Sequence, residues 1–448
     1  MPSALRPSAL VLFLGDIIFF VMALVVTLFL RSFSMPQKEL LLAHLAAFAP
    51  LFFVWIVVYV IAGLYEGRRI ILARRALSTT LLYAQTANVI IAALFFFFVP
   101  AFGISPKTVL LIYLVVSFLF VLMWRALLFP KLGLRKDEAA LVIGEGPEAE
   151  ELVAALRSAP LSPVAVVKFI RSADKDILKE IREAVAAHRP RFVIIDPASP
   201  ALSKVFPELY NLAPAGVRFI DVRALYEDVF GRVPLSSVDE RWAVRTASRR
   251  VHMLYDPMKR LFDLVVALCV GLVSLIAYPF IILAIIAETG RPVFISQERV
   301  GRGGKPIRLS KFRTMTGNDN GVYQGGVSTL RVTRAGSFLR ATRLDELPQL
   351  WNVLAGDLSL IGPRPEFPAL VAEYEKKIPY YGLRHFIKPG LSGWAQIYHE
   401  NHPHHGTDVE ATREKLSYDL YYLKHRSFVL DVLIGLKTIA KMLTKSGV

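Results

Sequence analysis

Four long apolar runs constrain this chain more than any other feature. They cover roughly residues 9–30, 41–64, 81–102 and 108–129. A helix needs about 20 apolar residues to cross about 30 Å of hydrocarbon, so each run is long enough to span a membrane. The composition agrees, because 54% of the 448 residues are hydrophobic and only 20% are charged. We therefore predict that residues 1–136 form a membrane bundle of four spanning helices.

Basic residues are distributed unevenly around these runs. The loop between the second and third runs and the segment after the fourth are the richest in positive charge: Arg68, Arg69, Arg74, Arg75, Lys131, Arg135 and Lys136. Positively charged loops stay on the cytoplasmic side of a membrane. Both ends of the bundle, and the part of the chain that follows it, are therefore expected to face the cytoplasm.

The chain carries a large excess of positive charge. Its 53 Lys and Arg against 37 Asp and Glu give a formal net charge of +16. Such an excess suits anionic lipid surfaces, phosphorylated ligands or nucleic acid, and composition alone does not choose among them. The single cysteine, Cys269, excludes an intrachain disulfide and a zinc site built from cysteines.

Residues 137–250 change character, because short apolar runs alternate there with helical patterns. This alternation predicts a small Rossmann-like α/β domain with a parallel sheet. The turn at 144–149 fits the dinucleotide pattern G-x-G-x-x-A, but Pro147 is unusual in it, and Arg171 follows the next strand where an acidic residue is typical. A degenerate or regulatory domain is therefore the alternative to nucleotide binding. "DKD" at 174–176 resembles a metal-binding Asp-x-Asp motif, although helix capping explains it better.

A fifth apolar run, about 264 to 287, carries Pro279 in its middle and has basic residues on both sides. A full crossing would put the rest of the chain on the opposite side from the α/β domain. Because proline breaks a helical ladder, we expect a re-entrant helix-break-helix over about 258–287. The alternative is a spanning helix kinked at the proline.

The polar remainder of the segment 251–448 is where chemistry is expected. The glycines of 301–304 predict a β-hairpin, followed by Lys311 and Arg313 at i and i+2. In a strand these two cations would share one face, a spacing suited to phosphate oxygens. The alternative is a solvated basic strand.

Two adjacent acids, Asp345 and Glu346, precede Pro348, which is tolerated only near a helix start. The positive end of the helix dipole would stabilise both carboxylates there. A carboxylate pair can hold Mg²⁺, and one member can attack phosphorus to form an acyl phosphate. Helix capping explains one acid well and two acids among arginines less well.

The segment Gly362-Pro363-Arg364-Pro365 is a rigid loop that restricts the backbone on both sides of an arginine. A fixed guanidinium suits phosphate or pyrophosphate. Together with Lys311, Arg313 and Arg340, Arg364 would offset the repulsion between two phosphorylated reactants.

The strings "KFRTM", "TRLDELPQLWNVLAGDLSLIGPRPE", "KPGLSGWAQ" and "YDLYYLKHRSF" closely resemble the bacterial sugar transferases that initiate polysaccharide assembly. These are monotopic polyprenyl-phosphate phosphoglycosyl transferases, and the resemblance covers about 255 to 445 almost continuously. The four runs and the α/β domain are similar to the long form of the family, which starts exopolysaccharide or O-antigen synthesis.

The resemblance implies that a sugar-1-phosphate moves from a UDP-sugar to undecaprenyl phosphate, with release of UMP and a requirement for Mg²⁺. It implies that Asp345 is the nucleophile and that Glu346 associates with the metal. The family's phosphate-binding positions match Lys311, Arg340 and Arg364.

Two further positions carry over with less support. The family's helix-breaking proline matches Pro279, although Tyr278 replaces the serine that commonly precedes it. Asp419 lies in the matching "YDLYY" stretch, and its role in substrate binding is held loosely.

The implied location is the bacterial inner membrane with a catalytic domain facing the cytoplasm. Anionic membrane lipids are expected partners, nucleic acid is not, and a homodimer is compatible with the family. A hexose, with glucose as the first candidate, is the expected sugar. A glycosyltransferase that releases UDP and a non-catalytic scaffold or sensor of a polysaccharide export complex are the alternative hypotheses.

Two C-terminal features complete the sequence. The histidines His399, His402, His404 and His405 lie where relatives have a variable loop, and a surface loop is favoured over a transition-metal site. Beyond them, apolar and aromatic residues at helical spacing predict amphipathic helices on the membrane surface, or ordinary core-facing helices.

Overall fold

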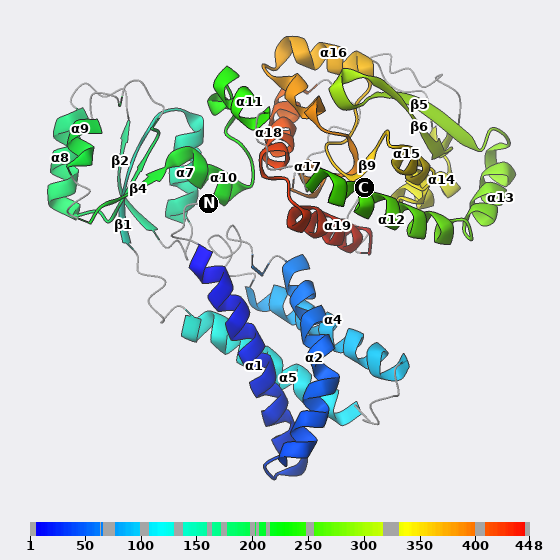
Figure 1. Cartoon of the computed structure of the whole chain (residues 1–448), viewed down its shortest axis with the longest axis horizontal. Coiled ribbons are helices and arrows are strands. Elements are labelled where there is room, and N and C mark those ends of the chain that lie inside the picture. Colours follow the sequence, from blue (N-terminus) through cyan, green and yellow to red (C-terminus); the bar gives the residue numbers. More distant parts are fainter. Residues whose placement is uncertain are drawn as a thin grey trace. The chain divides into compact units, whose positions relative to one another are not determined.

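The computed structural model describes residues 6–62, 64–65, 77–98, 107–129, 138–158, 164–171, 177–197, 202, 206–211, 216–247, 255–316, 331–398 and 408–443. Contacts divide the chain into two compact units, Met1–Gly231 and Arg232–Val448, and each is described here by itself (Figure 1).

The N-terminal helices are α1 (Arg6–Ser32), α2 (Lys38–Ile61), α4 (Leu77–Phe98) and α5 (Lys107–Met123), which continues as the π-helical turn η2 (Trp124–Leu128). Three helical stretches are long and apolar enough to cross a membrane: Leu10–Ser32, Lys38–Val60 and Val109–Leu128. They indicate that the chain associates with a membrane. In the described part of α4 the apolar stretch is Ala84–Ala93, which is shorter, so a fourth crossing stays a prediction.

The bundle core is aromatic and encloses one buried ion pair. The rings of Phe20, Phe48 and Trp55 pack against one another and are fully buried. Asp16 pairs with Arg125 and accepts a hydrogen bond of 2.5 Å from the Tyr65 hydroxyl. Each charge therefore has a partner, which an apolar environment demands.

The α/β part contains four parallel strands: β1 (Glu138–Gly144), β2 (Val164–Arg171), β3 (Phe192–Ile195) and β4 (Arg218–Asp221). Helices α7 (Pro147–Ser158) and α10 (Val222–Phe230) cover one face, and α8 (Ile177–His188) and α9 (Phe206–Tyr210) cover the other (Figure 1). The predicted parallel sheet is confirmed.

The strand order β2-β1-β3-β4 differs from the expected Rossmann arrangement. A Rossmann half has the order 3-2-1-4, whereas 2-1-3-4 is the flavodoxin-like order of doubly wound sheets. The reason is that the connection through α8 carries the chain past β1, so the third strand pairs on the far side of the first.

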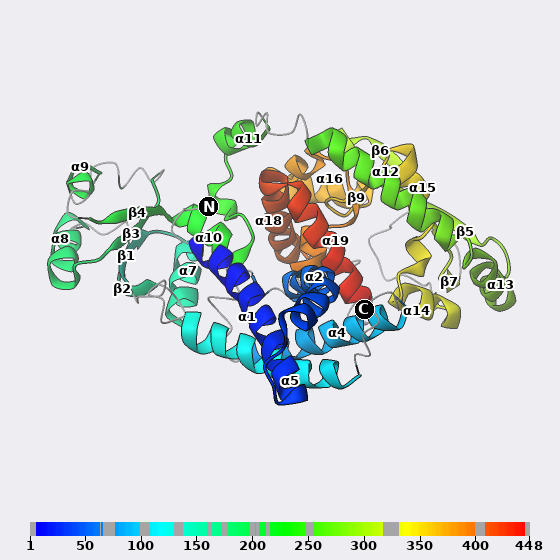
Figure 2. The ribbon, with the colours of Figure 1, turned by 60° about the horizontal axis from the view of Figure 1, so that its bottom comes forward.

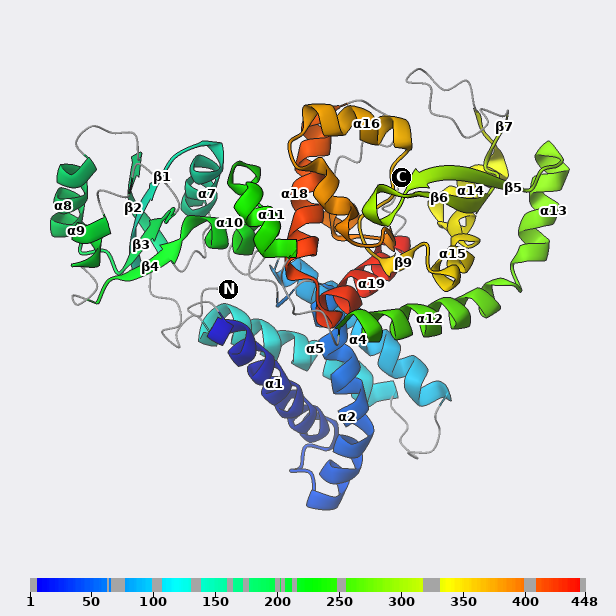
Figure 3. The ribbon, with the colours of Figure 1, turned by 45° about the horizontal axis from the view of Figure 1, so that its top comes forward.

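In the C-terminal unit, α12 (Tyr255–Ser274) and α13 (Tyr278–Thr289) form the predicted broken apolar helix, bent by 59° (Figure 3). Pro279 lies in the first turn of α13, where its missing N–H costs little. Leu261, Val273 and Phe280 are among the apolar side chains that this pair exposes. The break is thus shown, and return of the chain to its own side of a membrane stays a prediction.

The remaining elements build one α+β core. The strands are β5 (Phe294–Val300), β6 (Pro306–Phe312), β7 (Met315–Thr316), β8 (Arg331–Val332), β9 (Ser359–Ile361) and β10 (Gly390–Ser392). The helices are α11 (Glu240–Ala247), α14 (Arg334–Ala341), α15 (Gln349–Ala355), α16 (Pro368–Lys377), α17 (Trp394–Tyr398), α18 (Val409–His425) and α19 (Phe428–Leu443). Short 3₁₀ turns are η5 (Leu235–Ser237), η7 (Arg302–Gly304), η8 (Leu344–Glu346) and η9 (Tyr381–Phe386). The predicted hairpin is the antiparallel pair β5 and β6.

Residues 232–247 pack with the C-terminal unit. Val233 and Val238 are buried in its core, and the Val233 N–H donates to the Ser417 carbonyl at 3.0 Å. The boundary between the compact units therefore falls after Gly231, earlier than the expected boundary at 250. The apolar pattern of residues 233–238 is too short for the sequence to show which hydrophobic core these residues join.

Helices α18 and α19 lie beside the beginning of α12 (Figure 2), and a buried carboxylate ties the three helices together. Asp431 of α19 accepts hydrogen bonds from the hydroxyls of Tyr255 at 2.7 Å and Tyr422 at 2.6 Å, and from Lys259 at 3.0 Å. The buried carboxylate thus has three hydrogen-bond donors, as a buried polar group requires. The network fixes α18 and α19 against the first half of the bent helix pair.

Candidate active site

The adjacent acids Asp345 and Glu346 lie in the 3₁₀ turn η8, directly before α15. Arg343 precedes the turn in the left-handed conformation, with φ 55°. This backbone is uncommon for a residue with a side chain and is typical of functional sites. The turn directs Asp345 into the protein, where only 9% of the residue is exposed.

Glu346 is held by arginines. One of its carboxylate oxygens accepts from Arg364 Nη2 at 2.8 Å, and the other lies 3.9 Å from Arg343 Nη1. Burial opposes ionisation of Glu346, but the charges of Arg364 and Arg343 outweigh it and lower the pKa of this carboxyl. Glu346 is therefore ionised throughout the physiological range.

Asp345 differs from its neighbour. Burial and the negative charge of Glu346 raise the pKa of Asp345 to about 6, against the opposing charges of Lys311, Arg340 and Arg364. One acid of the pair thus remains charged while the other titrates near neutrality. Such splitting of two neighbouring carboxyls is typical of catalytic pairs.

Two cations of the hairpin extend this cluster. Burial and the charge of Arg299 lower the pKa of Lys311 to about 8. Burial and the charge of Arg364 lower the pKa of Arg299 itself to about 10, and its guanidinium lies 3.4 Å from the centroid of the Phe367 ring. Each of these positive charges disfavours the protonated, charged form of the others. The cluster therefore favours the binding of a negatively charged group.

The other two predicted cations have different surroundings. Arg340, in the last turn of α14, contributes to the electrostatics of Asp345, and its side chain has no hydrogen bond or ion pair to another described residue. Arg313 lies just beyond the end of β6 and donates to the carbonyls of Met315 and Arg291, both at 3.2 Å. Arg340 thus joins the acid pair, whereas Arg313 fastens the end of the hairpin.

The loop that carries Arg364 is fixed by close backbone contact. A Cβ at Gly362 would lie 2.5 Å from the Lys388 carbonyl oxygen, and one at Gly390 would lie 2.1 Å from the Gly362 nitrogen. Only glycine fits at both positions, where β9 and β10 run side by side. The loop is therefore anchored before it presents Arg364.

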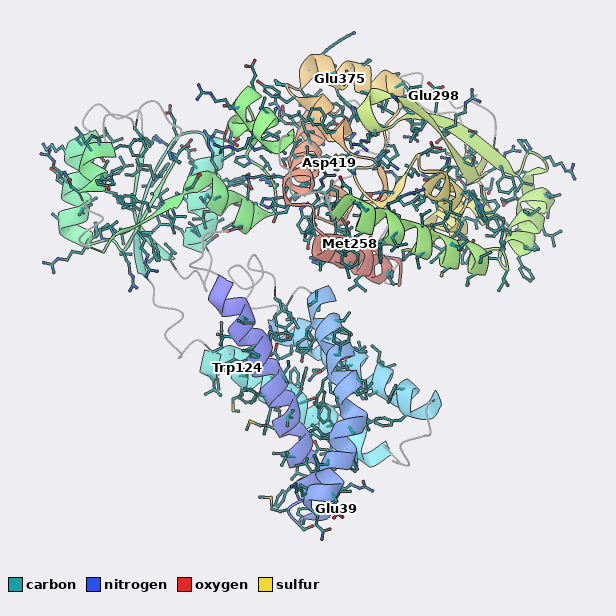
Figure 4. The ribbon with its side chains drawn as sticks, viewed as in Figure 1. Glu39, Trp124, Met258, Glu298, Glu375 and Asp419 are labelled. Carbon is teal, nitrogen blue, oxygen red and sulfur yellow. The ribbon has the colours of Figure 1, made fainter. Side chains whose placement is uncertain are left out.

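Asp419, labelled in Figure 4, supports this loop through Arg384. It lies on α18, is 2% exposed, and binds Arg384 through Nε at 3.0 Å and Nη2 at 2.8 Å. Arg384 in turn donates to the Arg364 carbonyl and to the Tyr381 hydroxyl, each at 2.9 Å. Through Arg384, Asp419 thus supports the backbone of the loop, and its expected role in substrate binding stays a prediction.

Arg299 and Arg384 are candidates that sequence patterns do not identify. Arg384 lies in a 3₁₀ turn with no periodicity, and only the tertiary contact with Asp419 gives it a role. Arg299 alternates in β5 with Gln297, like any exposed strand position. In the hairpin Arg299 pairs with Ile307, whereas Lys311 pairs with Ile295, so strand pairing gives no direct signal for Arg299 either.

The acid pair fits Mg²⁺ by the chemistry of its donors. Mg²⁺ prefers oxygen ligands and is usually held by one or two carboxylates together with substrate phosphates. Within the described ranges no group of three or more His, Cys, Asp or Glu is gathered. Burial and the negative charge of Glu346 raise the pKa of Asp345, and a bound cation would oppose both effects. The histidines of 399–405 lie outside the described residues, as does "DKD" at 174–176.

Comparison with known families gives two matches. Residues 254–445 match the family described as bacterial sugar transferase, and residues 49–192 match one described as CoA-binding domain. The first match contains the acid pair, the hairpin, the Arg364 loop and Asp419.

The described residues of the α/β turn do not fit an anionic cofactor such as CoA. Glu148 and Glu150 occupy the first turn of α7, and a Glu148 carboxylate oxygen lies 3.6 Å from the Cβ that Gly146 lacks. Arg171 is paired with Glu150 at 2.9 Å. The acids repel phosphate from the helix N-terminus that would bind it.

Several curated relatives match part of this chain. The UDP-N-acetylgalactosamine-undecaprenyl-phosphate N-acetylgalactosaminephosphotransferase of Aeromonas hydrophila is 38% identical over 242 residues, which is 53% of this chain and 55% of the relative. A UDP-glucose:undecaprenyl-phosphate glucose-1-phosphate transferase of Caulobacter vibrioides is 40% identical over 195 residues, 42% of this chain and 71% of the relative. The uncharacterized sugar transferase EpsL of Bacillus subtilis is 38% identical over 191 residues, 43% of this chain and 90% of the relative.

The match thus spans about half the length of the Aeromonas relative and nearly all of the Bacillus one. In each case its length corresponds to the C-terminal unit or little more. With the family match over 254–445 and these identities, the chain belongs to the bacterial sugar transferase family.

Proposed function

We propose that this protein transfers a sugar-1-phosphate from a UDP-sugar to undecaprenyl phosphate and releases UMP. The names of the relatives support the reaction class, because they include undecaprenyl-phosphate transferases for N-acetylgalactosamine and for glucose. The observation that carries the proposal in this chain is a buried acid, Asp345, with a pKa of about 6 in a cluster with excess positive charge.

The excess charge suits a nucleotide diphosphate. Among the described residues, five cations act on the two acids: Arg299, Lys311, Arg340, Arg343 and Arg364. Glu366 offsets only part of this excess: it acts on Arg299 and Arg364, but it is itself paired with Lys415. A pyrophosphate would supply the missing negative charge and would be stabilised as more charge develops on its oxygens.

The proposed reaction has two displacements at one phosphorus. An Asp345 oxygen attacks the β-phosphorus of the UDP-sugar, the bond from this phosphorus to the bridging oxygen breaks, and UMP leaves. An oxygen of undecaprenyl phosphate then attacks the same phosphorus and breaks the acyl phosphate bond, which regenerates Asp345. When bound by Asp345 and Glu346, Mg²⁺ would supply neutralising charge at the phosphates.

The chain's own residues prepare this chemistry. Arg364 is oriented by Glu346 on its side chain and by Arg384 on its carbonyl. Asp345 is screened from water, so its ionised form is a more reactive nucleophile than an exposed carboxylate. We propose the cytoplasmic face of the inner membrane as the location, with α12 and α13 as a re-entrant pair that brings the lipid phosphate to a soluble nucleotide sugar.

A panel of UDP-sugars, with UDP-glucose first, tests the proposal through its nucleotide product. Membranes containing the full chain and undecaprenyl phosphate are expected to release UMP from one of them, and Asp345→Asn to abolish release. UDP as the product would instead indicate a glycosyltransferase. No nucleotide release from any UDP-sugar, with the unchanged protein and with Asp345→Asn alike, would leave only the scaffold hypothesis.

The covalent step has its own test. UDP-sugar without acceptor is expected to give a stoichiometric burst of UMP and a protein labelled by the β-³²P-phosphoryl group, both absent in Asp345→Asn. A transferase that shows neither burst nor label would react by direct displacement.

A further inference from the structure

A second cluster of cations lies at the end of α15, apart from the acid pair. Helix α15 ends at Gly356, which has φ +98°. The position that a Cβ of Gly356 would occupy lies 3.5 Å from Arg260 Nη2 and 3.6 Å from Lys388 Nζ. Two positively charged groups from α12 and from the loop before β10 therefore meet at the same point.

Part of this charge has a structural role. Arg260 donates to the carbonyls of Val353 at 2.7 Å and Leu354 at 2.9 Å, and so caps the C-terminal end of α15. Lys388 makes no hydrogen bond or ion pair with another described residue. Burial and the charges of Arg260 and Arg302 lower the pKa of Lys388, whereas Asp263 and Asp357 oppose this shift. Cations dominate the point where Lys388 lies.

The nearby acids do not neutralise the cluster. Asp263 is buried and accepts from the Ser359 hydroxyl at 2.8 Å and the Leu360 N–H at 3.2 Å. Asp357 is exposed and solvated. Both acids are thus committed elsewhere or screened by water, which leaves a site able to accept an anion.

The cluster is electrostatically distinct from the candidate active site. The groups that act on Lys388 are Arg260, Arg302, Asp263 and Asp357, whereas those that act on Asp345 are Glu346, Lys311, Arg340 and Arg364. The two sets share no member. The acid pair precedes the N-terminal end of α15, whereas Lys388 lies at the C-terminal end of this helix, so an anion held by Lys388 is a different ligand from the reacting pyrophosphate.

The position on α12 identifies the kind of anion. Met258 and Leu261 flank Arg260 in sequence and are 53% and 63% exposed, and the exposed apolar stripe continues through Val265 and Leu268 (Figure 4 labels Met258). Cations at the beginning of an exposed apolar helix lie at the depth of lipid headgroups. Anionic headgroups attract basic residues at this depth by about 1 kcal/mol per Lys or Arg.

We propose that Lys388, Arg302 and Arg260 form a binding site for the phosphate of an anionic phospholipid, which seats the C-terminal unit on the membrane. Phosphate is the group recognised, and a membrane phospholipid is its source. The apolar stripe of α12 would contact the acyl chains of the same lipid. This inference does not depend on the proposed reaction, because it concerns a different set of residues and is measured by binding.

The test uses the purified full chain in detergent, with Lys388→Gln and Arg302→Gln as variants. Arg260 is left unchanged, because it caps α15. Native mass spectrometry and vesicle co-flotation compare phosphatidylglycerol with phosphatidylcholine. The unchanged protein is expected to retain phosphatidylglycerol preferentially, and each variant to bind it about fivefold more weakly.

Matched controls separate this site from general charge effects. Lys376→Gln removes an exposed lysine from the end of α16, and it is expected to bind as the unchanged protein does. Lys388→Arg keeps the charge and is expected to retain binding. Equal phosphatidylglycerol binding by Lys388→Gln, Arg302→Gln and Lys376→Gln would overturn the proposal.

Two further ligands distinguish the source of the phosphate. Competition by inorganic phosphate at millimolar concentration would overturn the lipid assignment in favour of a soluble phosphate. Retention of undecaprenyl phosphate but not phosphatidylglycerol, lost in Lys388→Gln, would assign the site to the acceptor instead. The proposal predicts neither outcome.

Discussion

Two acid–arginine pairs in the C-terminal unit have the same chemistry and opposite character. Asp419 and Arg384 are each 2% exposed, and Arg384 donates to Asp419, a hydroxyl and a carbonyl. Glu346 and Arg364 are 17% and 35% exposed at their side chains, and a second acid and several further cations surround them. The first pair is closed and satisfied, and the second is open and has excess charge.

The difference teaches how one fold separates support from reactivity. In the closed pair every charge is matched, so the pair can only hold the backbone in place. In the open pair the unmatched charges can be matched only by a ligand. Arg364 connects the two pairs, because its carbonyl accepts a hydrogen bond from Arg384 of the closed pair and its guanidinium donates to Glu346 of the open pair.

Breaking the closed pair is expected to have the largest effect. Asp419→Asn leaves the Arg384 charge buried without its counterion, so the free energy of unfolding should fall by about 3–5 kcal/mol. Denaturant unfolding of the detergent-solubilised chain measures it. Glu414→Gln, on the same helix, removes an exposed ion pair with Arg232 and should cost less than about 1 kcal/mol.

The apolar double variant Asp419→Leu/Arg384→Met sharpens this result. Replacing both charges is expected to recover most of the stability, while UMP release stays low because the Arg364 carbonyl has lost its donor. Recovery of both stability and activity would show that the closed pair does not position the loop.

Breaking the open pair, Glu346 and Arg364, should affect the reaction rather than the stability. Glu346→Gln removes the partner that orients Arg364, and UMP release is expected to fall about 10²- to 10³-fold. The free energy of unfolding should change by about 1 kcal/mol or less, because the partly exposed Arg364 can be hydrated. A large loss of stability without loss of rate would contradict the contrast between the pairs.

Asp345 is expected to destabilise the fold in exchange for reactivity. Its pKa of about 6 lies above the ordinary value near 3.9, so its ionised form weakens folding above pH 6 by up to about 3 kcal/mol. Most of this cost is gone at pH 4, where the carboxyl is protonated in the folded state and only partly ionised in the unfolded state. Asp345→Asn should therefore unfold at a higher temperature than the unchanged protein at pH 8 but not at pH 4. Destabilisation by Asn at pH 8 would refute the assignment.

The pH dependence of the rate is the finest comparison. Activity should rise through about pH 6 as Asp345 ionises, and fall above about pH 8 as Lys311 loses its proton. Lys311→Arg keeps the charge, so at pH 9 it should retain about tenfold more of its neutral-pH rate than the unchanged protein does. If the rates of Lys311→Arg and the unchanged protein fall equally above pH 8, Lys311 does not act through its charge.

Local patterns predicted the elements that carry the site. The glycines of 301–304 form the turn of the hairpin, Pro279 lies at the break between α12 and α13, and the acid pair precedes α15. Each of these follows from backbone preferences of glycine and proline that act over a few residues.

Long-range packing was not available from the same patterns. Arg384 meets Asp419 across 35 residues, and Val233 and Val238 join a core whose next buried member along the chain is Val300. Strand β4 has only four residues, two of them charged, and the sheet order depends on where α8 crosses. Such pairings depend on the whole fold rather than on any window of sequence.

The glycine contacts around the Arg364 loop limit how this protein can be altered. A side chain at Gly362 or Gly390 would collide with the backbone of the neighbouring strand. Mutational libraries intended to change sugar preference should therefore leave β9, β10 and the turn between Ile361 and Arg364 untouched. Variation will be tolerated only where it enters the site from other elements, so the proposed phosphate-binding half of the site is a fixed reference against which new sugar specificities can be selected.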